Sequence, residues 1–499
     1  MHLVLASSSV RRATLGRRAG LVALLALLML ALPRPLLAHT HLVKSAPAAK
    51  SRLAAPPDAI RLWFSEAPEV AFTRVVLMGP AGNTIATGKV TQDPANHLLL
   101  SVAIPTTLAP GQYTVSWSTA AADGHPSRGT FTFTVLGGAT ATSPPAAPAG
   151  TQAGAPPASG ATGAASPSAA SGQQGAPGVT TPASTTTSTP AAFDTSSPLY
   201  VLVRAVSFVA LLALLGVVAF HLLVLGTLRR TAALNGSTLD RASVRAARLG
   251  VIAAVALLVA TVARLYAESY AVYGATGDPG MAQIRAMLGQ TVWGLGWIIQ
   301  AAATLVALVL FIAATRRNAT AAWMLAALAV FVLAFTPALS GHAAASPHEK
   351  PLAIAIDGLH VLGAGGWLGT LLVVMAVGIP VALGLGAQRG RAIADVVNAF
   401  SPLALTFAGL TAATGIINAW LRLGTLPALW ESSYGRTLIV KLVVLSLVVA
   451  TGAYNWRRVR PSLGDEAGTL RIRRSASVEL IIGLVVVIVT AVLVAPPPP

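Results

Sequence analysis

The stretch from Leu199 to Gly226 reads LYVLVRAVSFVALLALLGVVAFHLLVLG. It is apolar almost throughout, with Arg204 as its one formally charged residue and His221 near its end. A run of this length and hydrophobicity is long enough to cross a bilayer as a helix. It therefore predicts a membrane-spanning helix.

Further stretches of the same character follow this one to the end of the chain. With Leu199–Gly226 they make eight segments, the others being approximately residues 246–270, 287–314, 321–340, 354–385, 397–421, 436–456 and 476–495. The overall composition agrees, because 54% of the residues are hydrophobic and 10% are charged. Residues 197–499 are thus predicted to form an all-α, polytopic membrane bundle of about eight transmembrane helices.

The loops between these segments alternate in positive charge. The first, third, fifth and seventh loops hold most of the arginines: Arg229, Arg230, Arg241, Arg245, Arg248, Arg316, Arg317, Arg389, Arg391, Arg457, Arg458, Arg460, Arg471, Arg473 and Arg474. Arginine-rich loops of membrane proteins face the cytoplasm. We expect a multi-pass protein of the cytoplasmic (inner) membrane, with the domain that precedes the spans on the extracytoplasmic side.

The same distribution accounts for the net charge of +18. The arginines lie at the N-terminus and at helix ends, so topology explains the charge and a nucleic-acid partner is not expected. The chain has no cysteine, which excludes disulfides and thiolate metal sites. No G-x-x-x-x-G-K-[ST] motif is present either, so no nucleotide is expected to bind.

Residues 1–38 have the layout of a signal peptide. Basic residues at Arg11, Arg12, Arg17 and Arg18 precede an apolar run from Leu21 to Leu32 and a short segment that ends at Ala38. Cleavage after Ala38 would make His39 the mature N-terminus. An uncleaved signal anchor is the alternative, and it would leave His39 without a free amine.

Residues 39–136 read as a small β domain. Stretches at 59–65, 74–78, 97–102, 112–118 and 129–135 are rich in β-branched and aromatic residues and are separated by turn residues. This spacing favours an antiparallel sandwich or barrel. Residues 137–196 are almost entirely Ala, Gly, Pro, Ser and Thr, which predicts a disordered linker. On such a tether the β domain is expected to move over the membrane face rather than dock rigidly.

The β domain contains several histidine and carboxylate side chains that could bind a metal ion through nitrogen or oxygen. Cupric ion takes about four such donors in a near-planar arrangement, and thiolates are not required. One donor set is the amine and imidazole of His39 with Asp123 and His125, two residues apart and thus on one side of an extended segment. The other set is the amine, two backbone amides and the imidazole of His41. An ordinary turn at Asp123–His125, without a metal, is the third interpretation.

Four motifs of this region resemble landmarks of the periplasmic copper-binding protein family CopC. They are HTHLVKSAP at 39–47, LWFSE at 62–66, GQYTVSW at 111–117 and ADGHP at 122–126. The resemblance covers residues 39–135 in the family's order, and it implies a cupredoxin-like barrel.

The CopC resemblance also implies a set of metal ligands. The family's Cu(II) site corresponds to His39, Asp123 and His125 in this chain. Glu66 matches a glutamate that lies near the metal in some members, and His41 is a further ligand or a neighbour of the site. Met78 is the only methionine of the domain, so a Cu(I) site is not expected there.

The membrane segments hold their own group of ionisable residues. His342, His348, Asp357 and His360 surround the fourth outer loop and the start of the fifth span. Asp357 and His360 are three apart, and hence share a helix face. Ionisable groups at this depth usually face a pathway or a partner. An interfacial histidine with one hydrogen bond is the simpler alternative.

These segments resemble the membrane copper protein family CopD over residues 200–496. The supporting motifs are Leu339–Ala343, Asp357–His360, Gly365–Gly369, Phe400–Ala404, Thr414–Asn418, Tyr434–Leu438 with Lys441, Asn455-Trp456 and Arg473–Glu479. A CopC domain fused to a CopD domain is similar to the CopCD or YcnJ-type copper-uptake proteins. The resemblance makes His342, Asp357 and His360 candidate ligands of a membrane copper path.

The expected function is capture of Cu(II) outside the membrane and its transfer, as Cu(I) or Cu(II), to the bundle for import, homeostasis or resistance. The expected partners are copper ions, the lipid bilayer and other periplasmic copper proteins, and no enzymatic activity or catalytic residue is expected. Three alternatives stay open: a membrane redox protein with b-type haem between His221 and His360, a copper oxygenase built on His39, and a copper buffer without transport.

Overall fold

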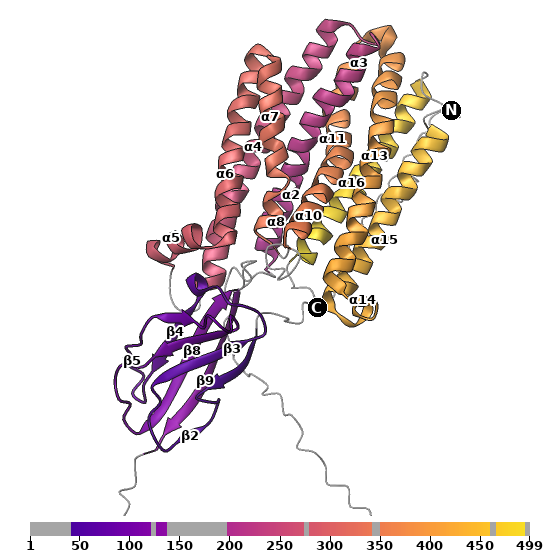
Figure 1. Cartoon of the computed structure of the whole chain (residues 1–499). Helices are drawn as coiled ribbons and strands as arrows, with labels where there is room; N and C mark the ends of the chain where they lie inside the picture. The colour runs from indigo at the N-terminus through magenta and orange to yellow at the C-terminus, as the bar shows by residue number, and fades with distance from the viewer. Residues whose placement is uncertain are drawn as a thin grey trace, which may run out of the picture.

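The chain folds into a β-sandwich and a helical bundle (Figure 1). The computed structural model describes residues 41–120, 126–136, 197–273, 279–341, 350–459 and 466–494. The expected signal peptide and linker therefore lie outside the described residues.

The sandwich consists of two sheets. One has four strands in the order β1 (Leu42–Ala46), β3 (Ala59–Phe64), β7 (Leu99–Ala103) and β6 (Val90–Gln92). The other has five, in the order β2 (Arg52–Leu53), β9 (Pro126–Val135), β8 (Gly111–Ala120), β4 (Arg74–Met78) and β5 (Thr84–Ile85). All pairs are antiparallel except β2 with β9. The predicted antiparallel sandwich is thus confirmed, with four short strands that the sequence patterns did not indicate.

Alternation of apolar and polar residues builds the sandwich core. In β3 every second side chain is buried, and β8 buries Tyr113, Val115 and Trp117 in the same way. Trp117 packs edge-to-face on Phe64 of the opposite sheet, with 5.2 Å between the ring centroids. This contact joins the two sheets.

The described part of the chain contains eight helices that are long and apolar enough to cross a membrane, as predicted. Their components are α2 (Pro198–Ala219) with η2 (Phe220–Leu225) and α3 (Gly226–Arg230); α4 (Gly236–Tyr273); α6 (Val292–Arg317); α7 (Thr320–Leu333) with α8 (Thr336–Leu339); α10 (Lys350–Ala364) with η3 (Gly365–Gly369), α11 (Thr370–Val373), η4 (Val374–Gly378) and α12 (Ile379–Leu383); η5 (Gly386–Gln388) with α13 (Arg389–Leu423); α15 (Ser433–Tyr454) with η6 (Asn455–Val459); and α16 (Glu466–Leu493). Two shorter helices, α5 (Met281–Gln290) and α14 (Ala428–Glu431), lie between spans.

The third span begins later than the predicted residue 287. Thr291 separates α5 from α6, and its hydroxyl caps α6 by accepting from the Gly294 amide at 2.9 Å. The backbone of Thr291 is extended, which turns α5 away from the axis of α6. Gly289, Gln290 and Thr291 interrupt the apolar run at this break, and a threonine before an apolar run is a local signal for a helix start.

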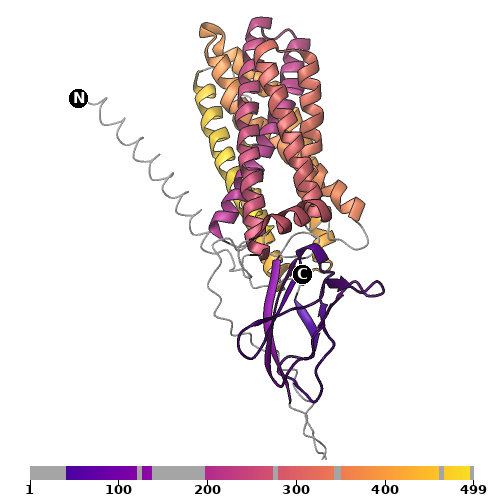
Figure 2. The same ribbon diagram turned by 90° about the vertical axis from the view of Figure 1, so that its left-hand side faces the viewer.

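The sandwich is docked on one end of the bundle, opposite the end that carries α3 (Figure 1). The side view places it at the same end (Figure 2). The short helix η1 (Val70–Phe72) and the end of β8 meet α4 and α5. Tyr273 donates a hydrogen bond to the Ala71 carbonyl at 2.9 Å. The expectation that the sandwich moves freely over the membrane face is therefore wrong for this structure.

An apolar cluster explains the docking. Phe72 and Ala120 of the sandwich are buried against the bundle residues Val272, Met287 and Trp293. Burial of large apolar side chains stabilises such a contact by roughly 1.5–3 kcal/mol each. A linker's composition predicts its own flexibility but carries no information about this cluster, which explains why the sequence-based expectation was wrong.

Glu69 at the docking surface provides a test of this contact. Burial raises the pKa of the Glu69 carboxyl, and Lys350 lowers it by a smaller amount. The charged carboxylate is therefore disfavoured where it lies, and this cost is present at pH 7. We expect Glu69→Gln to strengthen docking at pH 7.

A cysteine pair measures this effect, since the chain has no cysteine of its own. Val70→Cys on η1 and Met281→Cys on α5 are exposed positions on two helices that pack together. Crosslinking with a bismaleimide should be faster in the Glu69→Gln background. An equal or slower rate would mean that the attraction to Lys350 outweighs the burial of the carboxylate.

Candidate functional site

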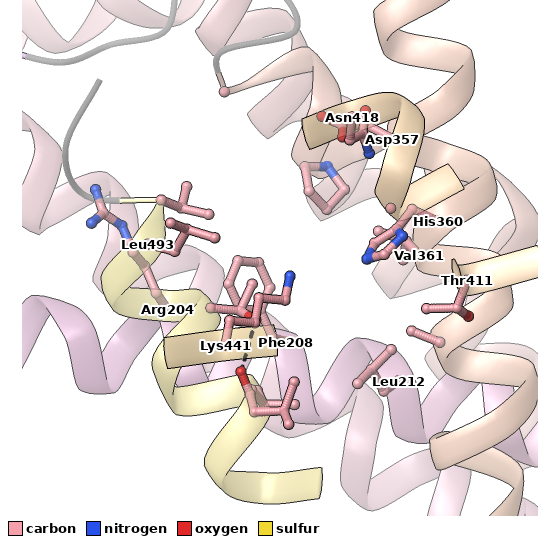
Figure 3. Close-up of a pocket in the computed structure, with 18 of the residues that line it drawn as sticks. Arg204, Phe208, Leu212, Asp357, His360, Val361, Thr411, Asn418, Lys441 and Leu493 are labelled. Carbon is pink, nitrogen blue, oxygen red and sulfur yellow. Dashed lines mark hydrogen bonds between the residues drawn. The ribbon is translucent and has the colours of Figure 1, made fainter. Parts of the chain in front are cut away.

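A cavity of about 250 Å³ opens in the bundle. It lies between α2, α10, α13, α15 and α16, towards the helix ends nearest the sandwich. Figure 3 shows Asp357 and His360 on one side of it, and Arg204 and Lys441 across from them. Two predicted site residues thus line one cavity, as their spacing of three on α10 indicated.

His360 is oriented by Thr414. The Thr414 hydroxyl lies 2.7 Å from the Leu410 carbonyl, to which it donates. It therefore accepts from His360, whose Nδ1 lies 3.1 Å away. This tautomer leaves Nε2 with a lone pair, which is the form of imidazole that binds a metal ion.

Asp357 is engaged in an ion pair. Its Oδ2 lies 2.6 Å from Nη2 of Arg422, and the two side chains are only 20% and 17% exposed. Tyr434 lies beside the same guanidinium. Asp357 thus holds Arg422 at the cavity and is a weaker metal ligand than a free carboxylate would be.

Loss of the Asp357 charge should destabilise the bundle. Asp357→Asn leaves the Arg422 cation half-buried without its counter-charge, which we expect to cost about 3 kcal/mol of the free energy of unfolding. Tryptophan fluorescence during thermal unfolding in detergent measures the change. The double variant Asp357→Asn/Arg422→Gln should recover part of the loss. If it is no more stable than the single variant, the pair is not what holds these helices.

The sandwich residues of the predicted site are only partly described. His39, Asp123, His125 and His342 lie outside the described residues, so the main copper ligands remain predictions. His41 is described: its amide donates to the Ser65 hydroxyl at 3.0 Å, and its carbonyl accepts from the Ser65 amide at 3.0 Å. Glu66 is exposed and follows Ser65 directly. The start of the domain is therefore held beside the F-S-E segment.

The end of β8 and the start of β9 face the bundle. β8 ends at Ala120, which pairs with Pro126 at the start of β9, and Asp123 and His125 fall between them in sequence. The Ala120 carbonyl accepts from the Glu69 amide at 2.9 Å, which places the start of η1 against the end of β8. Among the described residues no group of three or more His, Asp or Glu side chains could hold a metal ion.

Several polar residues near the cavity were not singled out from the sequence. Tyr200 donates a hydrogen bond to Glu268, and the Arg204 guanidinium lies 4.1 Å from the Tyr200 ring centroid. Arg264 donates to the Ser340 hydroxyl at 3.0 Å and to the Ser340 carbonyl at 2.8 Å. For Arg204, Arg264 and Glu268 the sequence signal is a charged residue within an apolar run.

His221 has surroundings of its own. Its ring stacks on Trp323 with 3.7 Å between centroids, and its Nδ1 lies 2.9 Å from the Ser243 hydroxyl. These residues lie near α3, whereas His360 lines the cavity at the other end. The two histidines are therefore not placed to ligate one haem, which leaves that alternative without support.

The β-sandwich and the eight spans together define a multi-pass membrane protein with an appended β domain. Three families match consecutive parts of the chain: CopC domain over residues 42–136, Copper resistance protein D-like, N-terminal domain over 194–351, and Copper resistance protein D over 394–493. The chain belongs to the CopC/CopD copper resistance and transport family, and both resemblances predicted from the sequence are confirmed.

The chain is similar to one relative over almost its whole length and to others over the β domain alone. Copper transport protein CutJ of Bacillus subtilis is 26% identical over 489 residues, which cover 95% of this chain and 77% of CutJ. Protein YobA of Escherichia coli is 38% identical over 98 residues, which cover 20% of this chain and 79% of YobA. The crystal structure of PcoC, a methionine-rich copper resistance protein from Escherichia coli, matches 20% of this chain and 99% of its own at 35% identity and a TM-score of 0.18.

Proposed function

We propose that this chain imports copper: the sandwich captures Cu(II) outside the cytoplasmic membrane and passes it to the cavity at His360. The observation that supports this most is the docking. The end of the sandwich that carries η1, His41 and the β8–β9 strand ends is seated on the bundle end at which the cavity lies. Capture site and cavity then share one compartment.

The distribution of charge supports an extracytoplasmic sandwich. The arginine-rich helix ends lie at the end of the bundle opposite the sandwich, and by the positive-inside rule this favours a sandwich on the outside. On this side His39, Asp123 and His125 would ligate Cu(II), with Glu66 and His41 nearby, and the donor types suit that ion. The chain acts as a transporter rather than an enzyme, and other extracytoplasmic copper proteins would deliver its cargo.

Copper accumulation measured at low and at high external copper distinguishes a defect in capture by the sandwich from a defect in transfer through the bundle. We expect His39→Ala to lower copper accumulation by roughly tenfold when copper is scarce, since a missing ligand weakens metal binding by at least that factor. At high external copper the accumulation should approach that of the unaltered protein, because the cavity can then fill directly. Accumulation is measured by elemental analysis of cells that produce each variant.

His97→Ala is the matched control, since His97 is an exposed histidine of the same domain outside the predicted ligand set. Unchanged accumulation by His39→Ala at every copper concentration would refute capture by the sandwich. N-terminal sequencing of the mature chain should begin at His39, and another start would refute the donor set that uses its amine.

A further inference from the structure

The described lining of the cavity carries more positive than negative charge. Four cationic side chains reach it, Arg204, Arg264, Arg422 and Lys441, against the single carboxylate of Asp357. Burial of a cation in an apolar bundle is costly unless a counter-charge or full hydrogen bonding compensates it. A cation of this lining that lacks both a counter-charge and a full set of hydrogen-bond acceptors is therefore a candidate to bind an anion.

Two of the four have evident partners. Arg422 is paired with Asp357 at 2.6 Å. Arg204 lies over the Tyr200 ring, and Tyr200 in turn donates to Glu268. Neither residue requires a further anion.

The positive charge of Arg264 has no negatively charged group among the partners that the structure describes. Its described partners are neutral, namely the hydroxyl and carbonyl of Ser340 and the face of Trp293 at 5.5 Å. Its Nε is buried and lacks a hydrogen-bond partner among the described residues. A buried guanidinium N–H in this state leaves binding capacity for an acceptor that carries negative charge.

Lys441 is in a similar position. The charged groups that act on it are Arg422 and Asp357, which already neutralise each other. Within the described ranges no hydrogen bond to its ammonium group is found. Lys441 is partly exposed and lines the cavity, so its ammonium group brings three donors to the lining that no described residue accepts from.

We propose that the cavity binds a phosphate group, with Arg264 and Lys441 as the residues that hold it. Guanidinium and ammonium groups are the side chains that recognise phosphate oxygens in proteins. The rest of the lining is largely apolar, from residues such as Phe208, Leu438 and Val486. This combination fits the head group of an anionic phospholipid from the outer leaflet better than the free ion.

This site goes beyond copper import and does not depend on it. It also gives the cavity a negative charge that a copper ion at His360 would otherwise lack. Binding is measured without copper, so its result is separate from that of the uptake experiments.

Native mass spectrometry of the full chain in neutral detergent tests the proposal. The protein is titrated with phosphatidylglycerol, with phosphatidylcholine of the same acyl chains, and in a parallel series with inorganic phosphate. We expect phosphatidylglycerol to bind preferentially. Lys441→Gln and Arg264→Gln should each weaken it by about tenfold or more, as loss of a charge-assisted hydrogen bond predicts. Lys441→Arg should retain binding.

Arg285→Gln is the matched control, because Arg285 is exposed on α5 and does not line the cavity. It should leave binding unchanged. Binding of inorganic phosphate alone, with the same dependence on Lys441 and Arg264, would support the site and assign it to the free ion. Equal binding of the two lipids, binding insensitive to both glutamine variants, or no binding of either probe would overturn it. Unfolding of Lys441→Gln in the same detergent at the temperature of the unaltered protein shows that its loss of binding does not come from misfolding.

Discussion

Replacement of His360 by glutamine is expected to reduce copper accumulation to roughly a tenth or less at all external copper concentrations. His360 is the one histidine of the described cavity lining, and Thr414 leaves its Nε2 free to bind a metal ion. Glutamine keeps a similar volume and polarity but has no nitrogen lone pair for the metal. Copper then has no nitrogen ligand at the step that follows capture, so added external copper does not restore its transfer.

Thr414→Val provides a graded comparison, because it keeps the imidazole but removes the hydroxyl that orients it. We expect accumulation between that of His360→Gln and the unaltered protein. Unlike His39→Ala, neither variant should recover at high copper, since the defect lies after capture. Accumulation by His360→Gln equal to that of the unaltered protein would exclude this histidine from the path.

Replacement of Gly369 by leucine is expected to destabilise the bundle by about 3 kcal/mol or more, as a strongly overpacked core position does. Gly369 of η3 and Gly216 of α2 allow two backbones to touch. A Cβ on Gly369 would collide with the Leu212 carbonyl oxygen, and one on Gly216 with the Gly369 carbonyl group. These atoms are backbone, so the two helices must separate to accommodate a side chain.

Gly409→Ala is the matched control. Gly409 also lies within a spanning helix, but a Cβ there would meet no atom within 4 Å. It should unfold at the same temperature as the unaltered protein or slightly above it, because alanine favours the helix. Thermal unfolding in detergent compares the three proteins. Equal unfolding temperatures for Gly369→Leu and Gly409→Ala would show that the contact between α2 and η3 is not tightly packed.

Local patterns predicted most of the architecture. The apolar runs predicted eight spans, because a helix that crosses a bilayer must be apolar over its whole length. Alternation predicted the main strands, and Ile60, Leu62 and Phe64 are buried as the period of two requires. The break at Thr291 was not predicted, because a hydrophobic run averaged over a whole span hides the short interruption at Gly289, Gln290 and the capping Thr291.

The candidate site was predictable only in part. Asp357 and His360 were expected on one helix face, and both line the cavity. The ion-pair partner of Asp357 was not predicted, because Arg422 is 65 residues away and lies on another helix. Arg264 and Lys441 gave a weaker signal still, as a single cation in an apolar segment does not show whether it has a counter-charge.

The sequence by itself determined the class of protein: a β domain with copper-ligand motifs before an eight-span bundle of the CopC/CopD family. Hydrophobic length, strand alternation and short motifs are local properties that each segment carries alone. Only the tertiary structure decided that the sandwich docks, through Tyr273 and a residue 202 positions earlier, and that cations from separate helices share one cavity. Such contacts depend on how distant surfaces pack, and packing is a property of the whole chain.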